Sequence, residues 1–127
     1  MKLEKRYLEV LYKTIKGTEG VLTLAEGRIR DAFMKDVTEA TTQFENDRRV
    51  IYEKFCTKTE DDKPDVSDGK YHFKPEDVKD IQSELDVLYA EEVELPDNER
   101  IKEIIERTQY KPEIGEAEKI DHIISKF

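Results

Sequence analysis

The sequence contains a single cysteine, Cys56, among its 127 residues. One thiol cannot form an intramolecular disulfide, and it cannot supply a four-cysteine zinc site or a CxxC redox pair. The N-terminal stretch lacks the apolar core of about 7 to 15 residues that marks a signal peptide, and no apolar run approaches the roughly 20 residues that cross a bilayer. These absences predict a cytoplasmic protein with no membrane contact.

Histidine and glycine are also scarce. Neither His72 nor His122 has a companion at metal-binding spacing, and the five glycines fit no GxxxxGK[ST] or GxGxxG phosphate loop. The acidic loop before Gly69 fails as a calcium loop, because aligning Gly69 with the loop glycine puts Pro64 and Val66 at ligand positions. We therefore predict no catalytic residue, no metal site and no cofactor, in a protein that is not an enzyme.

Charge, by contrast, is abundant. Charged residues make up 42% of the chain, and 31 acidic against 22 basic side chains give a formal charge of -9. This charge repels phosphates and is not attracted to anionic lipid, so we predict no direct binding of nucleic acid. A basic protein partner remains compatible with it. Eleven aromatic residues argue against disorder, and the length suits one domain with a modest core.

Apolar spacing predicts two helices in the first half of the chain. Residues Lys2–Lys16 carry apolar side chains at three- and four-residue steps, and Gly17 ends the helix. Thr23 and Glu26 have the spacing of a capping box, which begins a helix of about 33 residues and about 50 Å. One short neighbour cannot cover so long a helix. Either later segments cover the rest, or two copies pair as a homodimer through the long helix.

A turn and a restart follow, in the stretch "DVSDGKYHFKPEDVKDI". The Asp68-Gly69 dipeptide favours a two-residue hairpin, and Pro75 suits the first position of a third helix that ends near Ala90. The alternation in 91–95 predicts a strand with Val93 and Leu95 on its inner face, and this strand could add to the hairpin. The expected fold is mainly α with a small β element (α+β), namely a long central helix packed by shorter helices and a hairpin or sheet of two to three strands near 65–73 and 91–95. We expect a single domain over 1–127, with a helical hairpin at 2–57, a hairpin-helix-strand unit at 65–95 and C-terminal helices at 97–127.

Two surfaces are candidates for binding a partner. The first is an acidic group, which either meets a basic partner or keeps a short strand from pairing with other chains: Glu91, Glu92, Glu94, Asp97 and Glu99. The second is the apolar face of the last helix, with Ile123, Ile124 and Phe127. It docks on the protein's own core or inserts in a partner's groove.

The segments "RRVIYEKFCTKTEDDKPDVSDGKYHF" and "KPEDVKDIQSELDVLYAEEVEL", with the opening "YLEVLYKTIKG", resemble small acidic helical accessory proteins of tailed bacteriophages, a family without an assigned activity. The resemblance covers about residues 44–95. It implies no catalytic residue and a protein that acts in the host bacterial cytoplasm by binding a host protein or protein complex. We expect an inhibitor or modulator of a host enzyme or defence system, and the alternative is a helper of virion assembly, such as a chaperone or a head-tail accessory protein.

Overall fold

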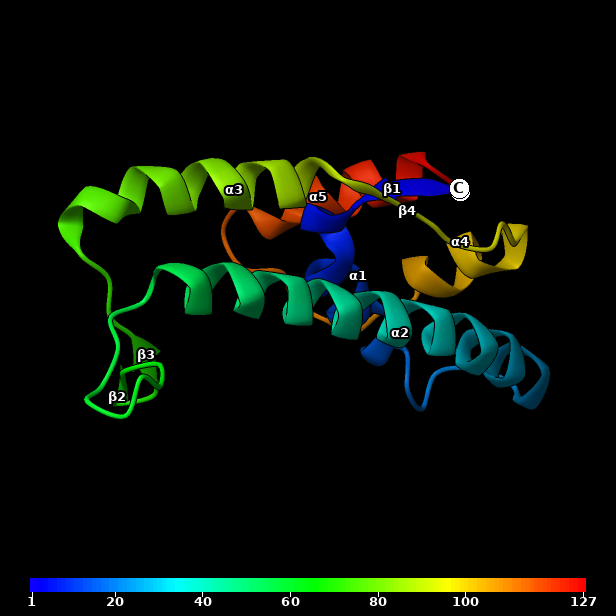
Figure 1. The fold of residues 1–127 in the computed structure, drawn as a ribbon. Coiled ribbons are helices and arrows are strands. Elements are labelled where there is room, and N and C mark those ends of the chain that lie inside the picture. The colour runs from blue at the N-terminus through cyan, green and yellow to red at the C-terminus, as the bar shows by residue number, and fades with distance from the viewer.

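A long helix, α2 (Leu24–Phe55), runs along one side of the molecule in the computed structural model, which describes residues 1–127. Helix α3 (Val78–Ala90) runs along the opposite side, and α1 (Leu8–Lys16) lies between them in this view (Figure 1). The remaining elements are two C-terminal helices, four short strands and two 3-10 turns: α4 (Glu99–Glu106), α5 (Glu116–Ser125), β1 (Lys2–Glu4), β2 (Val66–Ser67), β3 (Lys70–Tyr71), β4 (Glu92–Glu94), η1 (Lys5–Tyr7) and η2 (Pro75–Asp77). The chain is 61% helical, which confirms the predicted α+β class with a long central helix.

The start of α2 is the predicted capping box. The Thr23 hydroxyl accepts a hydrogen bond from the Glu26 N–H (3.3 Å), and the Glu26 carboxylate accepts one from the Thr23 N–H (3.1 Å). Two N–H groups that a helix start leaves without partners are thereby satisfied. The helix then continues for 32 residues, close to the predicted length.

The N-terminal segment differs from the prediction. Residues Lys2–Glu4 form strand β1, and α1 begins only at Leu8 after the turn η1. β1 pairs antiparallel with β4, so that Leu3 lies opposite Val93. Leu3 fits the apolar spacing of a helix as well as the inner face of a strand, and its distant partner decides between them.

The hairpin forms as predicted, but β4 does not join it. Asp68 (φ 55°) and Gly69 (φ 73°) both have positive φ, as the central residues of a type I′ turn require, and β2 pairs with β3. The predicted strand at 91–95 forms as β4, but the option that it adds to this hairpin is wrong, because β4 pairs with β1. The hairpin lies at the end of the molecule where α2 turns back toward α3, whereas β4 follows the other end of α3 (Figure 1).

The main core is one cluster of fifteen buried residues, to which α1, α2, α4 and α5 all contribute. The side chains that are almost fully enclosed include Leu8, Leu11 and Ile15 of α1 and Ile101, Ile104 and Ile105 of α4. Burying these side chains is the main stabilising contribution, at roughly 1.5–3 kcal/mol for each.

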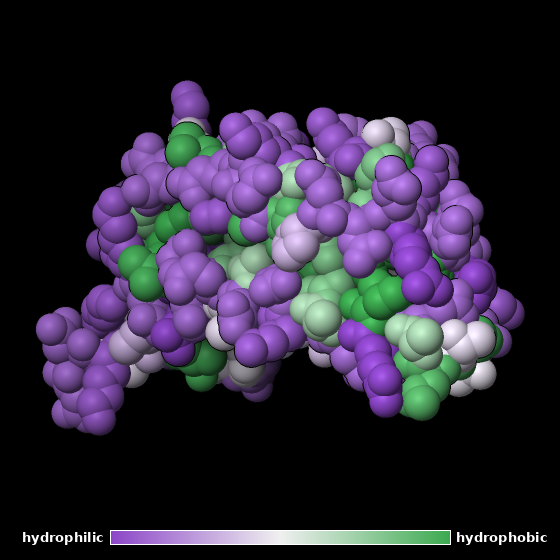
Figure 2. All heavy atoms as spheres, turned by 90° about the vertical axis from the view of Figure 1, so that its right-hand side faces the viewer, coloured by the Kyte–Doolittle hydropathy of each residue, from purple (hydrophilic) through white to green (hydrophobic).

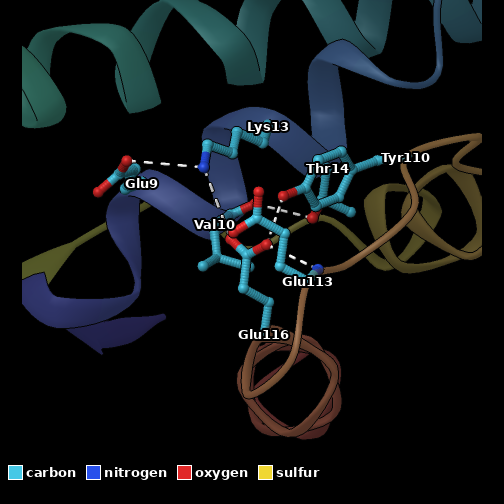
Figure 3. Close-up of polar contacts among 7 residues, drawn as sticks. All are labelled: Glu9, Val10, Lys13, Thr14, Tyr110, Glu113 and Glu116. Atoms are coloured by element: carbon cyan, nitrogen blue, oxygen red, sulfur yellow. Dashed lines mark hydrogen bonds and ion pairs between the residues drawn. The ribbon is translucent and has the colours of Figure 1, made fainter.

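The segment between α4 and α5 is fixed to the end of α1 by a polar network (Figure 3). The Tyr110 hydroxyl donates to Glu116 (2.6 Å), and Lys13 lies 3.6 Å from the same carboxylate. The Thr108 hydroxyl donates to the backbone oxygen of Thr14 (2.6 Å). This network holds α5 against α1.

Gly17 allows this close approach. A Cβ atom there would lie 2.5 Å from the Thr108 hydroxyl and 2.8 Å from the Tyr110 nitrogen. Gly17 ends α1 as predicted, with an ordinary φ of -69°. The glycine is therefore required by the contact between two segments rather than by a left-handed backbone.

Candidate functional site

A groove lies between β4 with its following loop and the middle of α2. We call it the β4–α2 groove. Its volume is about 640 Å³, and it has acidic and apolar walls, lined by Met1, Asp36, Glu39, Ala40, Gln43, Val93, Glu94, Leu95, Pro96 and Asp97. The pairing of β1 with β4 positions one wall, because it holds β4 and the loop that leads from β4 to α4.

The groove continues toward α4. A second hollow of about 450 Å³ shares Asp36 and Pro96 with it. Half of its lining is apolar, with Ile29, Phe33 and Ile101 among these side chains, and Arg28 and Asn98 add polar groups. Figure 2 shows the end of the molecule that carries α4 and the start of α2, where apolar atoms are visible between hydrophilic ones. The acidic groove thus has an apolar extension.

The four carboxylates of the groove differ in their partners. The amino group of Met1 lies 3.0 Å from the Glu94 carboxylate and 3.1 Å from that of Asp97, and it donates a hydrogen bond to the Leu95 oxygen. The hydrogen bond with Glu94 is the main cause that raises the pKa of this amino group. Asp36 and Glu39 have no ion pair within the chain. The α2 wall therefore carries two carboxylates that form no ion pair within the chain.

The structure divides the predicted acidic group. Glu94 and Asp97 line the β4–α2 groove, and Glu99 lies in a neighbouring hollow with Phe127. Glu92 is exposed on the outer face of β4. Glu91 points to a different groove and pairs with Lys5 at 2.7 Å.

Asp36 and Glu39 were not among the predicted site residues. They belong to a helix with many charges, and nothing local to the sequence separates them from Asp31 or Glu45. The usable signal was their position: Asp36, Glu39 and Gln43 follow helical spacing beside the apolar stripe of Val37, Ala40 and Phe44, and so lie on one flank of it.

The apolar face of the last helix is largely occupied within the chain. Ile123 is 1% exposed and belongs to the core, so a partner cannot reach it in this conformation. Ile124 and Phe127 are half-buried against the core, and the Phe127 ring lies 5.9 Å from that of Phe33. Phe127 keeps an exposed part beside Glu99.

A second groove lies between the C-terminal half of α2 and α3. Its volume is about 630 Å³, and its lining includes Val50 and Val87, which are 61% and 66% exposed. Two lysines partly neutralise its carboxylates, since Lys54 pairs with Glu84 (2.8 Å) and Lys5 with Glu91. This α2–α3 groove is therefore less acidic in effect than the β4–α2 groove, where Asp36 and Glu39 have no ion pair.

The polar network on α1 brings Lys13, Tyr110 and Glu116 together (Figure 3). Its hydrogen bonds lower the pKa of Glu116, chiefly through Tyr110, and raise the pKa of Tyr110, chiefly through Glu116. Both shifts keep each group in its ordinary charge state at neutral pH. That is the behaviour of a structural contact, because a general acid or base needs a pKa near the working pH.

The fold and the grooves together define an acidic α+β protein with a long central helix and a charged groove between a strand and that helix. No protein-family model matches the chain, and no curated protein or solved structure is similar to it. No group of three or more His, Cys, Asp or Glu side chains is arranged to hold a metal ion. None of the helices combines the length and the apolar character that crossing a membrane requires.

Proposed function

We propose that this chain is a non-enzymatic protein-binding module that takes a basic segment of a partner protein in the β4–α2 groove. One observation supports it above the others. Carboxylates from segments far apart in the sequence, Asp36 and Glu39 on α2 and Glu94 and Asp97 after α3, line one groove with apolar walls. Lysine and arginine side chains of a partner would find there both charge and apolar surface for their stems.

The charge of the whole molecule favours the same kind of partner. A net charge of -9 attracts a basic protein over distances of about a Debye length, roughly 8 Å at physiological salt, and raises the rate of encounter. With the resemblance to phage accessory proteins, the proposed role is that of an inhibitor or modulator of a host enzyme or defence system in the bacterial cytoplasm. Such a protein acts by occupying a basic site on its target.

A matched pair of variants tests the proposal. Glu39 and Glu45 are both exposed glutamates of α2 without an ion pair, and only Glu39 lines the groove. Glu39→Lys and Glu45→Lys change the net charge equally, so they differ only in where the charge is reversed. We expect Glu39→Lys to weaken binding of a partner captured from a host lysate several-fold more than Glu45→Lys does, with an affinity that falls as salt rises. Equal affinities of the two variants would contradict the proposal.

The α2–α3 groove favours a second candidate, a helper of virion assembly. Val50 and Val87 form an exposed apolar pair beside Ile51 and Leu88, which suits a subunit contact or a second copy of the chain along the long helix. Light scattering of the wild type and of a Val50→Asp, Val87→Asp variant tests this. A dimer that the double substitution dissociates, together with co-purification of capsid or tail protein, is the expected result; a monomer that captures neither protein would rule it out.

A further inference from the structure

Strand β4 has one edge that no other part of the chain pairs with. The Leu95 N–H donates to the Met1 oxygen and the Lys5 N–H donates to the Glu91 oxygen, both at 2.8 Å. In an antiparallel pair, residues of the same parity point their backbone groups to the partner strand, so 91, 93 and 95 face β1. The N–H and C=O groups of Glu92 and Glu94 therefore point away from β1.

These outward groups are free. The sheet has only two strands, and none of the backbone hydrogen bonds outside helices and strands involves Glu92 or Glu94. The β4–α2 groove is lined by Val93 and Glu94 of this strand, by Met1 next to β1, and by α2 across from them. An exposed strand edge beside a groove is the arrangement in which proteins accept an additional strand.

The side chains of β4 restrict what such a strand contains. Glu92 and Glu94 are exposed on the outer face, whereas Val93 faces inward and is half-buried against the core. Side chains directly opposite each other in a sheet share a face. A strand on this edge would thus place residues opposite Glu92 and Glu94 on the outer face, and the residue between them would face Val93.

A second copy of this chain is a poor occupant. Pairing of two β4 edges would bring the glutamates of one copy opposite those of the other, and like charges directly opposite are unfavourable. A strand with basic residues at alternate positions meets Glu92 and Glu94 with opposite charge. It also brings positive charge close to Asp36 and Glu39 across the groove.

We infer that the β4–α2 groove receives its partner as an extended segment that pairs antiparallel with β4, with basic residues opposite Glu92 and Glu94 and a small apolar residue between them against Val93. The inference rests on the proposed function and adds to it the conformation and the residue pattern of the bound segment. In this register the N–H and C=O groups of Glu92 and Glu94 all form hydrogen bonds with the segment.

Two capped synthetic peptides of equal composition test the pattern: one alternates lysine and valine (Lys-Val-Lys-Val-Lys), and the other has them in blocks (Lys-Lys-Lys-Val-Val). Each is titrated into the ¹⁵N-labelled full chain. We expect the alternating peptide to bind at least several-fold more tightly, and to slow hydrogen exchange of the Glu92 and Glu94 amides. The blocked peptide carries the same charge and controls for electrostatic attraction.

Two variants at one position separate the backbone from the charge. Glu94→Gln removes the carboxylate and keeps the N–H group. Glu94→Pro removes both, and it leaves the bonds to β1 intact because this N–H group points away from β1. We expect Glu94→Pro to abolish the preference for the alternating peptide and Glu94→Gln to retain it. The amide shifts of Leu3 and Val93 report whether the β1–β4 pair is still formed in each variant.

The outcomes distinguish this inference from the proposed function. Equal affinities for the two peptides, with unprotected Glu92 and Glu94 amides, overturn strand addition and leave a groove that binds by charge. Strand addition would also be overturned if a basic peptide that binds as a helix protected these amides and the alternating peptide did not. Binding of the alternating peptide that Glu39→Lys does not weaken overturns the proposed role of the groove.

Discussion

The two ends of the molecule are stabilised in different ways. At the packed end, where α1, α4, α5 and the first half of α2 meet, the core contains side chains that are 0–1% exposed, such as Leu11, Ile104 and Ile123. At the hairpin end, where the last turns of α2 meet the hairpin and the start of α3, the rings of Tyr52, Tyr71 and Phe73 pack only half-buried, 5.7–6.4 Å apart.

The difference follows from how many elements surround each stretch of α2. Cys56, Ile81 and Leu85 are buried at or near the hairpin end, yet they lie outside the main core cluster. Polar contacts supplement them there, such as the 2.8 Å pair of Lys54 with Glu84. The surroundings of α2 therefore differ in stability along its length. We expect the hairpin end to open first.

The largest expected loss of stability comes from truncating one buried leucine in each of the two regions. Leu11 is 0% exposed within the main cluster, and Leu11→Ala removes its contacts and leaves a cavity, at a cost of about 4 kcal/mol of unfolding free energy. Leu85, at 6% exposed, lies outside that cluster, and Leu85→Ala should cost about 2 kcal/mol because fewer neighbours surround it. Urea denaturation measures both. Equal losses would remove the distinction between the two ends.

The next effect concerns the contact at Gly17. Gly17→Ala places a methyl group against Thr108 and Tyr110, so the 108–110 segment must move, and we expect a loss of about 1–3 kcal/mol. The matched control is Gly27→Ala in α2, where a new methyl group meets nothing within 4 Å. There alanine should stabilise the helix by about 0.5–1 kcal/mol. Opposite signs in thermal unfolding are the expected outcome, and a stabilised Gly17→Ala protein would contradict the close contact.

Acid should weaken the packed end through Glu26. Its carboxylate lies 2.6 Å from Arg107, and the hydrogen bond with Arg107, followed by that with the Thr23 N–H, lowers the pKa of Glu26 to about 2. Because this pKa lies below that of the unfolded chain, about 4.3, the contribution is complete above that value and is lost as pH falls toward 2.

The control for this effect is Glu26→Gln. The melting temperature of the wild type should fall faster than that of Glu26→Gln between pH 4.5 and 2, and the two should converge near pH 2. Glu116, whose pKa is also lowered, contributes to the acid slope of both proteins and so cancels in the difference. Parallel melting curves over this range would show that the Glu26–Arg107 pair does not stabilise the fold.

The smallest effect is expected in the hairpin. Asp68 has a φ of 55°, a conformation that aspartate tolerates better than alanine. Asp68→Ala should destabilise the hairpin by about 1 kcal/mol and leave the global melting temperature almost unchanged. Hydrogen exchange of the Lys70 amide, which faces Ser67 across the turn, measures the local opening. A global loss as large as that of Leu11→Ala would mean that the hairpin unfolds together with the core.

The features that the sequence predicts correctly are local. The Thr23–Glu26 capping box and the Asp68-Gly69 turn each depend on residues within four positions of each other. Strand β1 was missed because three residues define it and its partner lies after α3. Without that partner, Leu3 continues a helical stripe equally well.

The residues of the candidate site show the same difference between local and distant signals. Glu94 and Asp97 were predicted because they stand in a visible acidic run, and the structure does place them in the groove. Asp36 and Glu39 are one wall of it, but only the tertiary placement of α2 across the groove from β4 shows which of the seven acidic residues of α2 face the groove. Ile123 was a candidate for a partner surface, with docking on the protein's own core as the alternative, and it lies in the core because its helix packs on α1.

The β1–β4 pairing also fixes an order of events in synthesis. The contact between Met1 and Glu94 spans 93 positions of the chain. At about 5–20 residues per second, the ribosome needs roughly 5–20 seconds between making one strand and making the other. During that interval α1 and α2 can form from local signals, while the first residues wait unpaired. The open edge of β4 therefore appears after α1, α2 and α3 have been made, and a newly made chain acquires its proposed binding groove only when two segments far apart in the sequence have met.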